Sequence, residues 1–462
     1  MMPEQERDTR RPNVLWILGD QHRGQALGCA GDSNLETPHL DRLAGAGATA
    51  IAGSPLCTPY RGSMLTSRYP HECCPGHDHA MPEGLPTIAT AFNEAGYRTA
   101  YFGKWHVDGA ANVGDAGSSG KQFVRPDRRG DFAFWLGYEN NNAQWDCWLH
   151  GHDFTGEPIQ LFRLPTYETD AITDLLIAFL TERGAARARK EETPFFAVMS
   201  VQPPHSPYEA PHEWTARHRA EDIRLRPNVP PIAWVQEEAR RDLAGYYAMI
   251  ENLDWNVGRI VEALASAGLL EDTYIVFFSD HGDMHGSHAR TLKCVPWEES
   301  LRTPFLVSKG GMPCRPRDDG FWNSLINHVD LAPTTLGLCG LPVPEHMRGH
   351  DYSGRFQGGE SGGGESPDSA YLQLVDPGYT FGFAPDRERP WRGIVTEDGW
   401  KYAVLEGQPW LMYDLNEDPF ELANLAHDGR FRRQRKTLQD RLAAWIERTG
   451  DFFALPGIGG RP

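Results

Sequence analysis

The sequence predicts an α/β protein in which a large, mostly parallel sheet is sandwiched by helices, and three observations carry this prediction. Short apolar runs alternate with longer stretches of helical periodicity through most of the chain. Several of these apolar runs end in charged or polar side chains. The 462 residues also suffice for a large core and for more than one domain. Alternation of this kind is typical of parallel sheets with helices on both faces.

The expected elements follow one another along the first part of the chain. The apolar runs that we expect to form buried strands are residues 13–20, 98–104, 195–201 and 274–281. The stretches with helix signals or helical periodicity are residues 37–43, 87–96, 169–182 and 237–268.

A second, smaller unit is expected after residue 365. Residues 357–367 are rich in glycine, serine and glutamate and are typical of an exposed linker. Beyond them, shorter strand candidates span residues 370–374, 391–396, 401–404 and 411–415, and a helix candidate spans 432–448. We therefore predict a catalytic α/β domain over residues 1–365 and a small antiparallel α+β subdomain over residues 366–462.

Composition restricts the partners of the protein. Lysine and arginine number 45 against 63 aspartates and glutamates, a formal net charge of −18 that repels nucleic acid and anionic membranes. No apolar run approaches the roughly 20 residues that a membrane span needs. Residues 1–11 are polar and show no signal-peptide pattern, so we expect a cytoplasmic protein that binds neither nucleic acid nor membrane. The eight cysteines form no CxxC pair, which favours reduced thiols.

The stretch from residue 56 to 66 combines a nucleophile with an anion site. Thr58 is a candidate N-cap and Pro59 suits a first helical position, so a helix is expected to begin beside Cys57. The positive end of the helix would then face the cysteine. Arg61 follows one turn later and would return alongside Cys57 as a fixed cation.

Polar side chains follow several of the predicted strands, at the edge where open α/β sheets bind ligands. The side chains that we expect in this one pocket are Asp20, Lys104, His106, His205, Asp280 and His281.

Two adjacent polar pairs suggest a metal site. Asp20–Gln21 and Asp280–His281 would supply two carboxylates, an imidazole and an amide oxygen to a divalent cation. The imidazole shifts the preference from Ca²⁺ towards Mn²⁺ or Zn²⁺. Each pair alone could instead cap the helix that follows its strand.

Cations and imidazoles would complete a site for a tetrahedral oxyanion. Arg61, Lys104 and Lys293 are fixed cations, while His106 and His205 can exchange protons. A lysine taken alone is usually a solvated charge, and His205 in Pro-Pro-His-Ser-Pro could equally be a packed loop residue.

Two further groups of residues have open interpretations. Trp105, Trp135, Trp145 and Trp148 could form an aromatic wall for an aryl or sugar group, or could be core anchors. Residues 71–79 are rich in histidine and cysteine, but their spacing fits no common zinc site. We interpret them as a loop over the pocket, from which Asp78 or His79 could touch the substrate.

Several motifs together resemble the formylglycine-dependent sulfatase family, within the alkaline-phosphatase-like superfamily. Residues 57–61, Cys-Thr-Pro-Tyr-Arg, match the family's C-x-P-x-R modification signal. Residues 103–106, Gly-Lys-Trp-His, are similar to its second signature, and residues 280–304 to its third. Residues 413–425 are similar to the family's C-terminal subdomain, so the resemblance spans nearly the whole chain.

The resemblance implies that Cys57 is oxidised to formylglycine by a formylglycine-generating enzyme. The hydrated aldehyde is a gem-diol: one hydroxyl attacks the sulfur or phosphorus, the alcohol leaves, and the second hydroxyl then expels the anion. Serine lacks this second hydroxyl. By the same resemblance, residue 57 and the side chains of Asp20, Asp280 and His281 hold one divalent metal ion, Ca²⁺ or Mn²⁺.

The other site residues also receive implied roles. Arg61 orients the diol, and Lys104 and Lys293 hold the non-bridging oxygens of a small anionic ester. His106 assists deprotonation of the diol and His205 acts on the leaving oxygen, or the two roles are exchanged.

Two departures from the family pattern bear on function. Tyr60 stands where many members have serine. Gln21 stands where many calcium sulfatases have a second aspartate, so the metal pairs look more like those of phosphonate monoester hydrolases and choline sulfatases. This strengthens Mn²⁺ as an alternative to Ca²⁺.

These observations give one leading hypothesis and two others. The first is a sulfuric-ester hydrolase, including an arylsulfatase. The second is a phosphonate monoester or phosphodiester hydrolase with promiscuous sulfatase activity. The third is an anion-binding protein in which Cys57 stays unmodified. A homo-oligomer is compatible with each of them.

Overall fold

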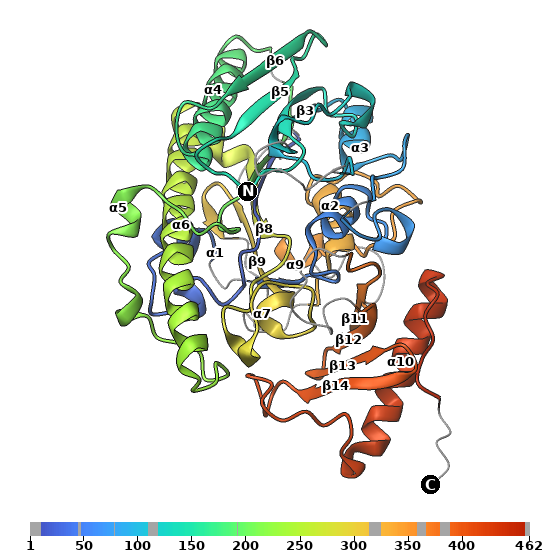
Figure 1. Cartoon of the computed structure of the whole chain (residues 1–462). Helices are drawn as coiled ribbons and strands as arrows, with labels where there is room; N and C mark the ends of the chain where they lie inside the picture. Colours follow the sequence, from blue (N-terminus) through green and yellow to red (C-terminus); the bar gives the residue numbers. More distant parts are fainter. Residues whose placement is uncertain are drawn as a thin grey trace, which may run out of the picture.

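A ten-stranded sheet and a separate four-stranded sheet make up the molecule (Figure 1). This computed structural model describes residues 11–44, 48–77, 79–109, 119–191, 193–313, 325–357, 366–378 and 389–457. Nine strands of the large sheet lie in the order β10-β9-β8-β1-β7-β3-β4-β5-β6, and β2 pairs with β9.

The centre of the large sheet is parallel. Its five strands are β8 (Thr273–Ser279), β1 (Asn13–Gly19), β7 (Phe195–Val201), β3 (Arg98–Lys104) and β4 (Phe134–Tyr138). Their carboxyl ends therefore meet at one edge of the sheet. This arrangement confirms the predicted α/β class.

The strands at both borders of this sheet are antiparallel. None of them was among the strands predicted from the sequence. The border strands are β9 (Arg302–Lys309), β10 (Met312–Pro313), β2 (Ala48–Ile51), β5 (Trp148–His152) and β6 (Pro158–Arg163). Such strands are short or run next to turns, so apolar periodicity alone identifies them poorly.

Helices cover both faces of the sheet, as the alternation of β1 requires. Val14, Trp16 and Leu18 face one layer, and Leu15 and Ile17 face the other. The first layer contains α2 (Cys57–Thr66), α3 (Ile88–Glu94) and α8 (Leu331–Leu338). The second contains α1 (Pro38–Ala44), α4 (Glu168–Ala188) and α6 (Ala233–Ser266).

Both faces of β1 are therefore buried, which explains its uninterrupted apolar sequence. Each large apolar side chain fully buried in such a core contributes about 1.5–3 kcal/mol. Three shorter helices lie in loops, namely α5 (His212–Thr215), α7 (Glu298–Leu301) and α9 (Ser353–Phe356).

The second sheet is antiparallel and carries the last helix, as predicted. Its strands are β11 (Ser369–Leu374), β12 (Trp391–Thr396), β13 (Trp400–Leu405) and β14 (Gln408–Asp414), followed by α10 (Arg432–Thr449). Side chains of β11 and β12 pack with Leu56, Leu301 and Leu325 in one apolar cluster. The division into domains at residues 365 and 366 stays a prediction, because residues 358–365 lie outside the described part.

Within the described residues, no helix is long and apolar enough to cross a membrane.

Candidate active site

Helix α2 places Cys57 at the carboxyl edge of the large sheet. The helix begins at Cys57 itself, with Leu56 in the N-cap position and no side-chain cap. The expectation that Thr58 is the cap was therefore wrong, and its hydroxyl is buried without a hydrogen-bond partner among the described residues. The free amide groups of the first turn still surround residue 57 with partial positive charge, so the predicted anion site keeps its physical basis.

The Cys57 thiol lies among charged side chains and is only 1% exposed. Its Sγ atom is 3.0 Å from Lys293 Nζ, 3.1 Å from His281 Nε2 and 3.6 Å from Asp20 Oδ1. Burial opposes ionisation of the thiol, but Lys293 and His281 outweigh burial and lower its pKa well below the ordinary value. This position therefore stabilises negative charge.

Asp20 and Asp280 meet here because their strands are parallel neighbours. Asp20 follows β1 and Asp280 follows β8, and Gly19 pairs with Ser279 in the register of the sheet. Asp280 Oδ1 accepts the backbone N–H groups of Gln21 (3.0 Å) and His281 (2.9 Å).

Asp20 is the most strongly paired carboxylate of the site. Its Oδ2 accepts hydrogen bonds from Lys104 Nζ (2.7 Å) and Arg61 Nη2 (3.3 Å). Burial favours the protonated form of Asp20, but Lys104 and Lys293 outweigh burial and hold its pKa well below the usual range. Asp20 is therefore an anion at neutral pH.

Four of the side chains bring metal-binding atoms together. One atom from each of Asp20, Cys57, Asp280 and His281 lies within 4.8 Å of the others. Oδ2 of Asp280 is buried without a hydrogen-bond partner in the described part of the chain, although Arg61 Nε lies 3.3 Å away. The residues therefore fit a divalent cation, with oxygen and nitrogen donors.

The imidazole of His281 is also oriented to bind a divalent cation. Its Nδ1 donates to the backbone carbonyl of Gly282 at 3.0 Å, since a carbonyl can only accept. Nε2 then faces Cys57 and the two carboxylates, and its lone pair would be free for a cation once the ring is neutral. A hydrogen bond of this kind commonly fixes the tautomer of a metal-binding histidine.

Arg61 and Lys104 are fixed by several contacts each. Arg61 Nη1 donates to Ser200 Oγ (2.8 Å) and to the backbone carbonyl of Lys104 (3.1 Å). Lys104 ends β3, next to Gly103, which has a φ of 101° and no room for a Cβ against the carbonyl of Ser200. Glycine is therefore required before the lysine.

His106 stands beside Cys57 in an unusual backbone conformation. Its φ is 56°, a value that is uncommon outside glycine and often found at functional sites. Its ring lies 5.1 Å from that of His77, and its Nδ1 is buried without a hydrogen-bond partner in the described structure. Burial lowers the pKa of His106 to about 3. The imidazole is therefore neutral at neutral pH.

His205 follows β7, the strand between β1 and β3. Its Nδ1 donates to the carbonyl of Ser206 at 2.7 Å, which leaves Nε2 as the atom that can take up and return a proton. Burial and the charge of Lys293 lower the pKa of His205 to about 3.

Lys293 is held by Gln21, whose amide oxygen the sequence analysis assigned to the metal ion, and by two side chains that it did not consider. Its Nζ donates to Gln21 Oε1 at 3.0 Å, and Gln21 Nε2 donates to Asp283 Oδ2 at 2.6 Å. Tyr208 donates to the same oxygen at 2.6 Å. The amide oxygen of Gln21 thus accepts a hydrogen bond from Lys293. Asp283 could have been noticed as a third acidic or imidazole residue after β8, but only the structure joins it to Tyr208.

The remaining candidates divide between core and surface. Trp105 and Trp135 are fully buried, so they are core anchors, whereas Trp145 is 44% exposed. His79 is exposed and bonds Asp376 at 2.9 Å. Asp78 lies outside the described residues.

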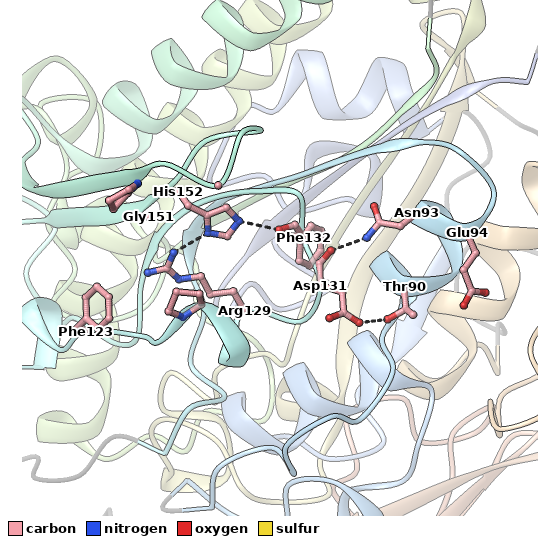
Figure 2. Close-up of a pocket in the computed structure, with 12 residues that line it drawn as sticks. Thr90, Asn93, Glu94, Phe123, Arg129, Asp131, Phe132, Gly151 and His152 are labelled. Carbon is pink, nitrogen blue, oxygen red and sulfur yellow. Dashed lines mark hydrogen bonds between the residues drawn. The ribbon is translucent and has the colours of Figure 1, made fainter.

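Two cavities lie apart from this site. The larger, of about 570 Å³, is lined by residues of α3, β5 and the segment before β4 (Figure 2). There Arg129 and His152 share a hydrogen bond of 2.7 Å, and Thr90 donates to Asp131 at 2.6 Å. The second cavity, of about 280 Å³, lies between α7 and the second sheet. The lining of each contains none of the side chains around Cys57.

The carboxyl edge of the parallel sheet thus carries a buried, charged site that suits an anionic group and a divalent cation. A family model described as Sulfatase matches residues 12–341. A second model, described as N-sulphoglucosamine sulphohydrolase, C-terminal, matches residues 286–448. The chain belongs to the sulfatase family and is a hydrolase that acts on sulfate esters, which confirms the family and the enzyme class predicted from the motifs.

Individual relatives agree with this assignment over nearly the whole chain. An ulvan-active sulfatase of Formosa agariphila is 32% identical over 473 residues, covering 97% of this chain and 84% of that protein. The solved structure of the sulfatase yidJ from Bacteroides fragilis has a TM-score of 0.80 at 26% identity, covering 97% of this chain and 98% of that one. The phosphonate monoester hydrolase of Agrobacterium radiobacter shares the fold, with a TM-score of 0.71 at 23% identity, covering 95% and 96% of the two chains.

Proposed function

We propose that this enzyme hydrolyses sulfuric esters with a formylglycine made from Cys57 and one divalent metal ion, Ca²⁺ or Mn²⁺. One observation supports the proposal above the others: the metal-binding atoms, the fixed cations and the imidazoles all converge on the single side chain of residue 57. The Cys-Thr-Pro-Tyr-Arg signal at residues 57–61 supports its oxidation by a formylglycine-generating enzyme.

The metal ion would be held by Asp20, Asp280, His281 and residue 57. When bound, the ion would supply Lewis acidity beside a hydrated aldehyde nucleophile. Arg61 would orient the diol at residue 57, because its contacts with Asp20, Asp280 and the end of β3 fix the guanidinium beside the metal-binding atoms.

Lys104 and Lys293 would bind the sulfate oxygens. Arg61, Lys104 and Lys293 face two carboxylates, which leaves an excess of positive charge even before a metal ion is added. These buried cations are pre-oriented, so they can stabilise negative charge that develops on the sulfate without reorganisation of water.

The two neutral imidazoles would move protons. His106, beside residue 57 and with Nδ1 left without a partner among the described residues, would accept a proton from the nucleophile. His205 would act on the leaving oxygen through Nε2, the nitrogen that its bond to Ser206 leaves open. The reverse assignment is the alternative, and the variants His106→Ala and His205→Ala separate the two. Substrates with better leaving groups should rescue only the variant that has lost the group acting on the leaving oxygen.

The decisive experiment uses full-length enzyme produced together with a formylglycine-generating enzyme. Mass spectrometry verifies formylglycine at residue 57, and the protein is then loaded with Ca²⁺ or Mn²⁺ and assayed with 4-nitrophenyl sulfate. We expect turnover that the Cys57→Ala variant lacks. Fully modified, metal-loaded enzyme that hydrolyses no sulfate ester would refute the proposal.

A second candidate is a phosphonate monoester or phosphodiester hydrolase with incidental sulfatase activity. It is favoured by the Asp20–Gln21 pair, which has one carboxylate fewer than the calcium sulfatase pattern. Comparison of kcat/KM for matched sulfate, phosphonate and phosphodiester substrates decides between the candidates, because a strong preference for sulfate removes the second.

A further inference from the structure

Glu139 is a buried carboxyl group at the catalytic edge that has no part in the chemistry described above. It directly follows β4, whose last residue, Tyr138, pairs with Lys104 at the end of β3. Its side chain is fully buried. Oε1 accepts the backbone N–H of Asp108 at 2.9 Å, whereas Oε2 is buried without a hydrogen-bond partner among the described residues. A carboxyl group buried for one hydrogen bond adds little stability, which points to another reason for its position.

The end of β4 binds the backbone on both sides of His106. The N–H group of Trp105, the residue before it, donates to the carbonyl of Tyr138 at 2.8 Å. The N–H group of Asp108, two residues after it, donates to the side chain of Glu139. Two successive residues of one strand end, Tyr138 and Glu139, therefore hold a four-residue segment that contains His106.

His106 requires such support because its own conformation is unfavourable. Its φ of 56° lies in the left-handed region, which a residue other than glycine keeps only when its surroundings hold it there. The neighbouring side chains of Trp105 and Val107 are buried in the apolar core. Nδ1 of His106 is buried and finds no hydrogen-bond partner within the described ranges, so the position of the ring depends on the backbone that carries it.

Two further contacts bind the same segment and do not involve Glu139. The carbonyl of Val107 accepts from the backbone N–H of Met81 at 2.8 Å. The carboxylate of Asp108 accepts from Arg128 Nε at 2.6 Å. Both contacts remain when Glu139 is replaced. The segment should therefore stay folded, while the placement of the imidazole that it carries changes.

We propose that Glu139 is a positioning residue, which holds His106 beside residue 57 by binding the backbone N–H of Asp108. The inference rests on the proposed function, in which His106 exchanges a proton with the reacting groups. A displacement of about 1 Å in such a group can lower the rate by about 100-fold. A single backbone hydrogen bond can therefore affect kcat, although Glu139 does not touch the reacting atoms.

Glutamine is the conservative replacement for this residue. Burial raises the pKa of Glu139 from 4.5 to about 8, so the carboxyl group is mainly protonated at neutral pH. A glutamine amide matches the protonated form: its oxygen can accept the N–H of Asp108, and its NH2 group takes the place of the O–H. Alanine removes the acceptor. Glu139→Gln should therefore keep the function that Glu139→Ala loses.

The test uses full-length enzyme, verified for formylglycine and loaded with metal, with 4-nitrophenyl sulfate at pH 7. The variants are Glu139→Ala, Glu139→Gln, His106→Ala and the double variant with alanine at both positions. Asp254→Ala is the matched control. Asp254 is also a buried carboxyl group that accepts backbone N–H groups, those of Leu40 (2.7 Å) and His39 (3.3 Å), but it joins α6 to α1. Circular dichroism and Tm check the folding of each variant.

We expect Glu139→Ala to lower kcat about 10–100-fold and to change KM by less than about threefold, because the cations that would bind the sulfate stay in place. Glu139→Gln should keep kcat within about threefold of the wild type. In the His106→Ala background, Glu139→Ala should lower kcat by less than a further threefold or so, because the group that it positions is already absent. Asp254→Ala should lower Tm but leave kcat within about twofold of the wild type.

Three results would overturn the inference. The first is a wild-type kcat in Glu139→Ala. The second is an equal loss in Glu139→Ala and Glu139→Gln, because glutamine keeps the acceptor. The third is a full 10–100-fold further loss in the His106→Ala background, which would show that Glu139 acts independently of His106.

A second variant covers the case in which Glu139→Ala does not fold. Glu139→Asp shortens the side chain by one CH2 group and draws the acceptor away from Asp108, so kcat should fall about tenfold. A wild-type kcat in this variant would also overturn the inference. By contrast, fully modified wild-type enzyme that hydrolyses no sulfate ester would refute the proposed function itself.

Discussion

At the scale of single residues, the position of Gln21 changes the interpretation of the metal pairs. Its amide oxygen accepts from Lys293, and its amide nitrogen donates to Asp283. The side chain thus orients a cation, and among the described residues two carboxylates, Asp20 and Asp280, face residue 57. Fewer carboxylates reduce the advantage of Ca²⁺, so Mn²⁺ is a serious candidate.

This arrangement predicts that Asp283 acts on catalysis through Lys293. Asp283→Asn should lower kcat/KM about 10–100-fold, because Gln21 loses its strongest acceptor and Lys293 is no longer held beside residue 57. Tyr208→Phe removes one hydrogen bond to the same carboxylate and should cost only about threefold. Steady-state kinetics checks both values, with circular dichroism as the control for folding. Equal losses in the two variants would contradict the proposed chain of contacts.

The proposed formylglycine chemistry at residue 57 predicts a difference between two small substitutions. Cys57→Ser can be sulfated on its hydroxyl but cannot expel the sulfate, so intact-mass analysis should show one added sulfo group and no turnover. Cys57→Ala should show neither. Multiple turnovers by the serine variant would contradict the need for a second hydroxyl on this residue.

At the scale of elements, the end of α10 is tied to the second sheet by one buried carboxylate. Asp451 accepts hydrogen bonds from Arg392, Tyr371 (2.6 Å) and Gln373 (2.8 Å). Burial opposes the charge of Asp451, but Arg392 outweighs it and lowers the pKa from 3.8 to about 2. A lowered carboxyl pKa means that the stabilisation is complete above pH 3.8 and is lost as the pH falls through 2.

The pair therefore predicts acid sensitivity of the C-terminal unit. Asp451→Asn should reduce the free energy of unfolding at pH 6 by roughly 2 kcal/mol, the equivalent of this pKa shift. Its thermal stability should also change less than that of wild type between pH 5 and pH 3. Asp440→Asn, on the same helix but half-exposed, is the control and should follow the wild type. An equal change of Tm between pH 5 and pH 3 in Asp451→Asn and in wild type would contradict this role of Asp451.

The elements also show what sequence alone could predict. The strands that precede Asp20, His205 and Asp280 and the strand that ends in Lys104 are mostly apolar, and their ends were correct to within a few residues. The prediction that Thr58 caps α2 was wrong. This helix starts in a buried position, where its amide donors need no particular side chain as a cap. Strand β9 was missed because it contains Pro304 and its first residues belong to the third signature, residues 280–304.

The contacts between distant segments could not be predicted. Asp283 and Tyr208 are 75 residues apart, and nothing in their spacing indicates that they share a hydrogen bond. The same holds for Gln202 and Asn142, 60 residues apart. Such pairs depend on the order of strands in the sheet, which periodicity does not give.

At the scale of the whole molecule, the proposed metal ion would join the ends of two central strands and helix α2. Removing it leaves two buried carboxylates close together, which destabilises the fold. Treatment with a chelator should abolish activity and lower Tm, and Mn²⁺ or Ca²⁺ should restore both. Free metal at 100 times its Kd contributes about 2.7 kcal/mol to stability. Asp280→Ala is the control, and a metal-dependent Tm in this variant would contradict the assigned ligands.

The burial of α2 also determines when Cys57 could be modified relative to folding. All ten residues from Cys57 to Thr66 are buried, so a modifying enzyme cannot grip this segment once the sheet has closed over it. If Cys57 is oxidised as we propose, the oxidation would have to occur while the chain is still unfolded, and folding would end the opportunity. Protein that folded first would then keep an unmodified Cys57. The specific activity of a preparation would then record how the speed of the modifying enzyme compared with the speed of folding.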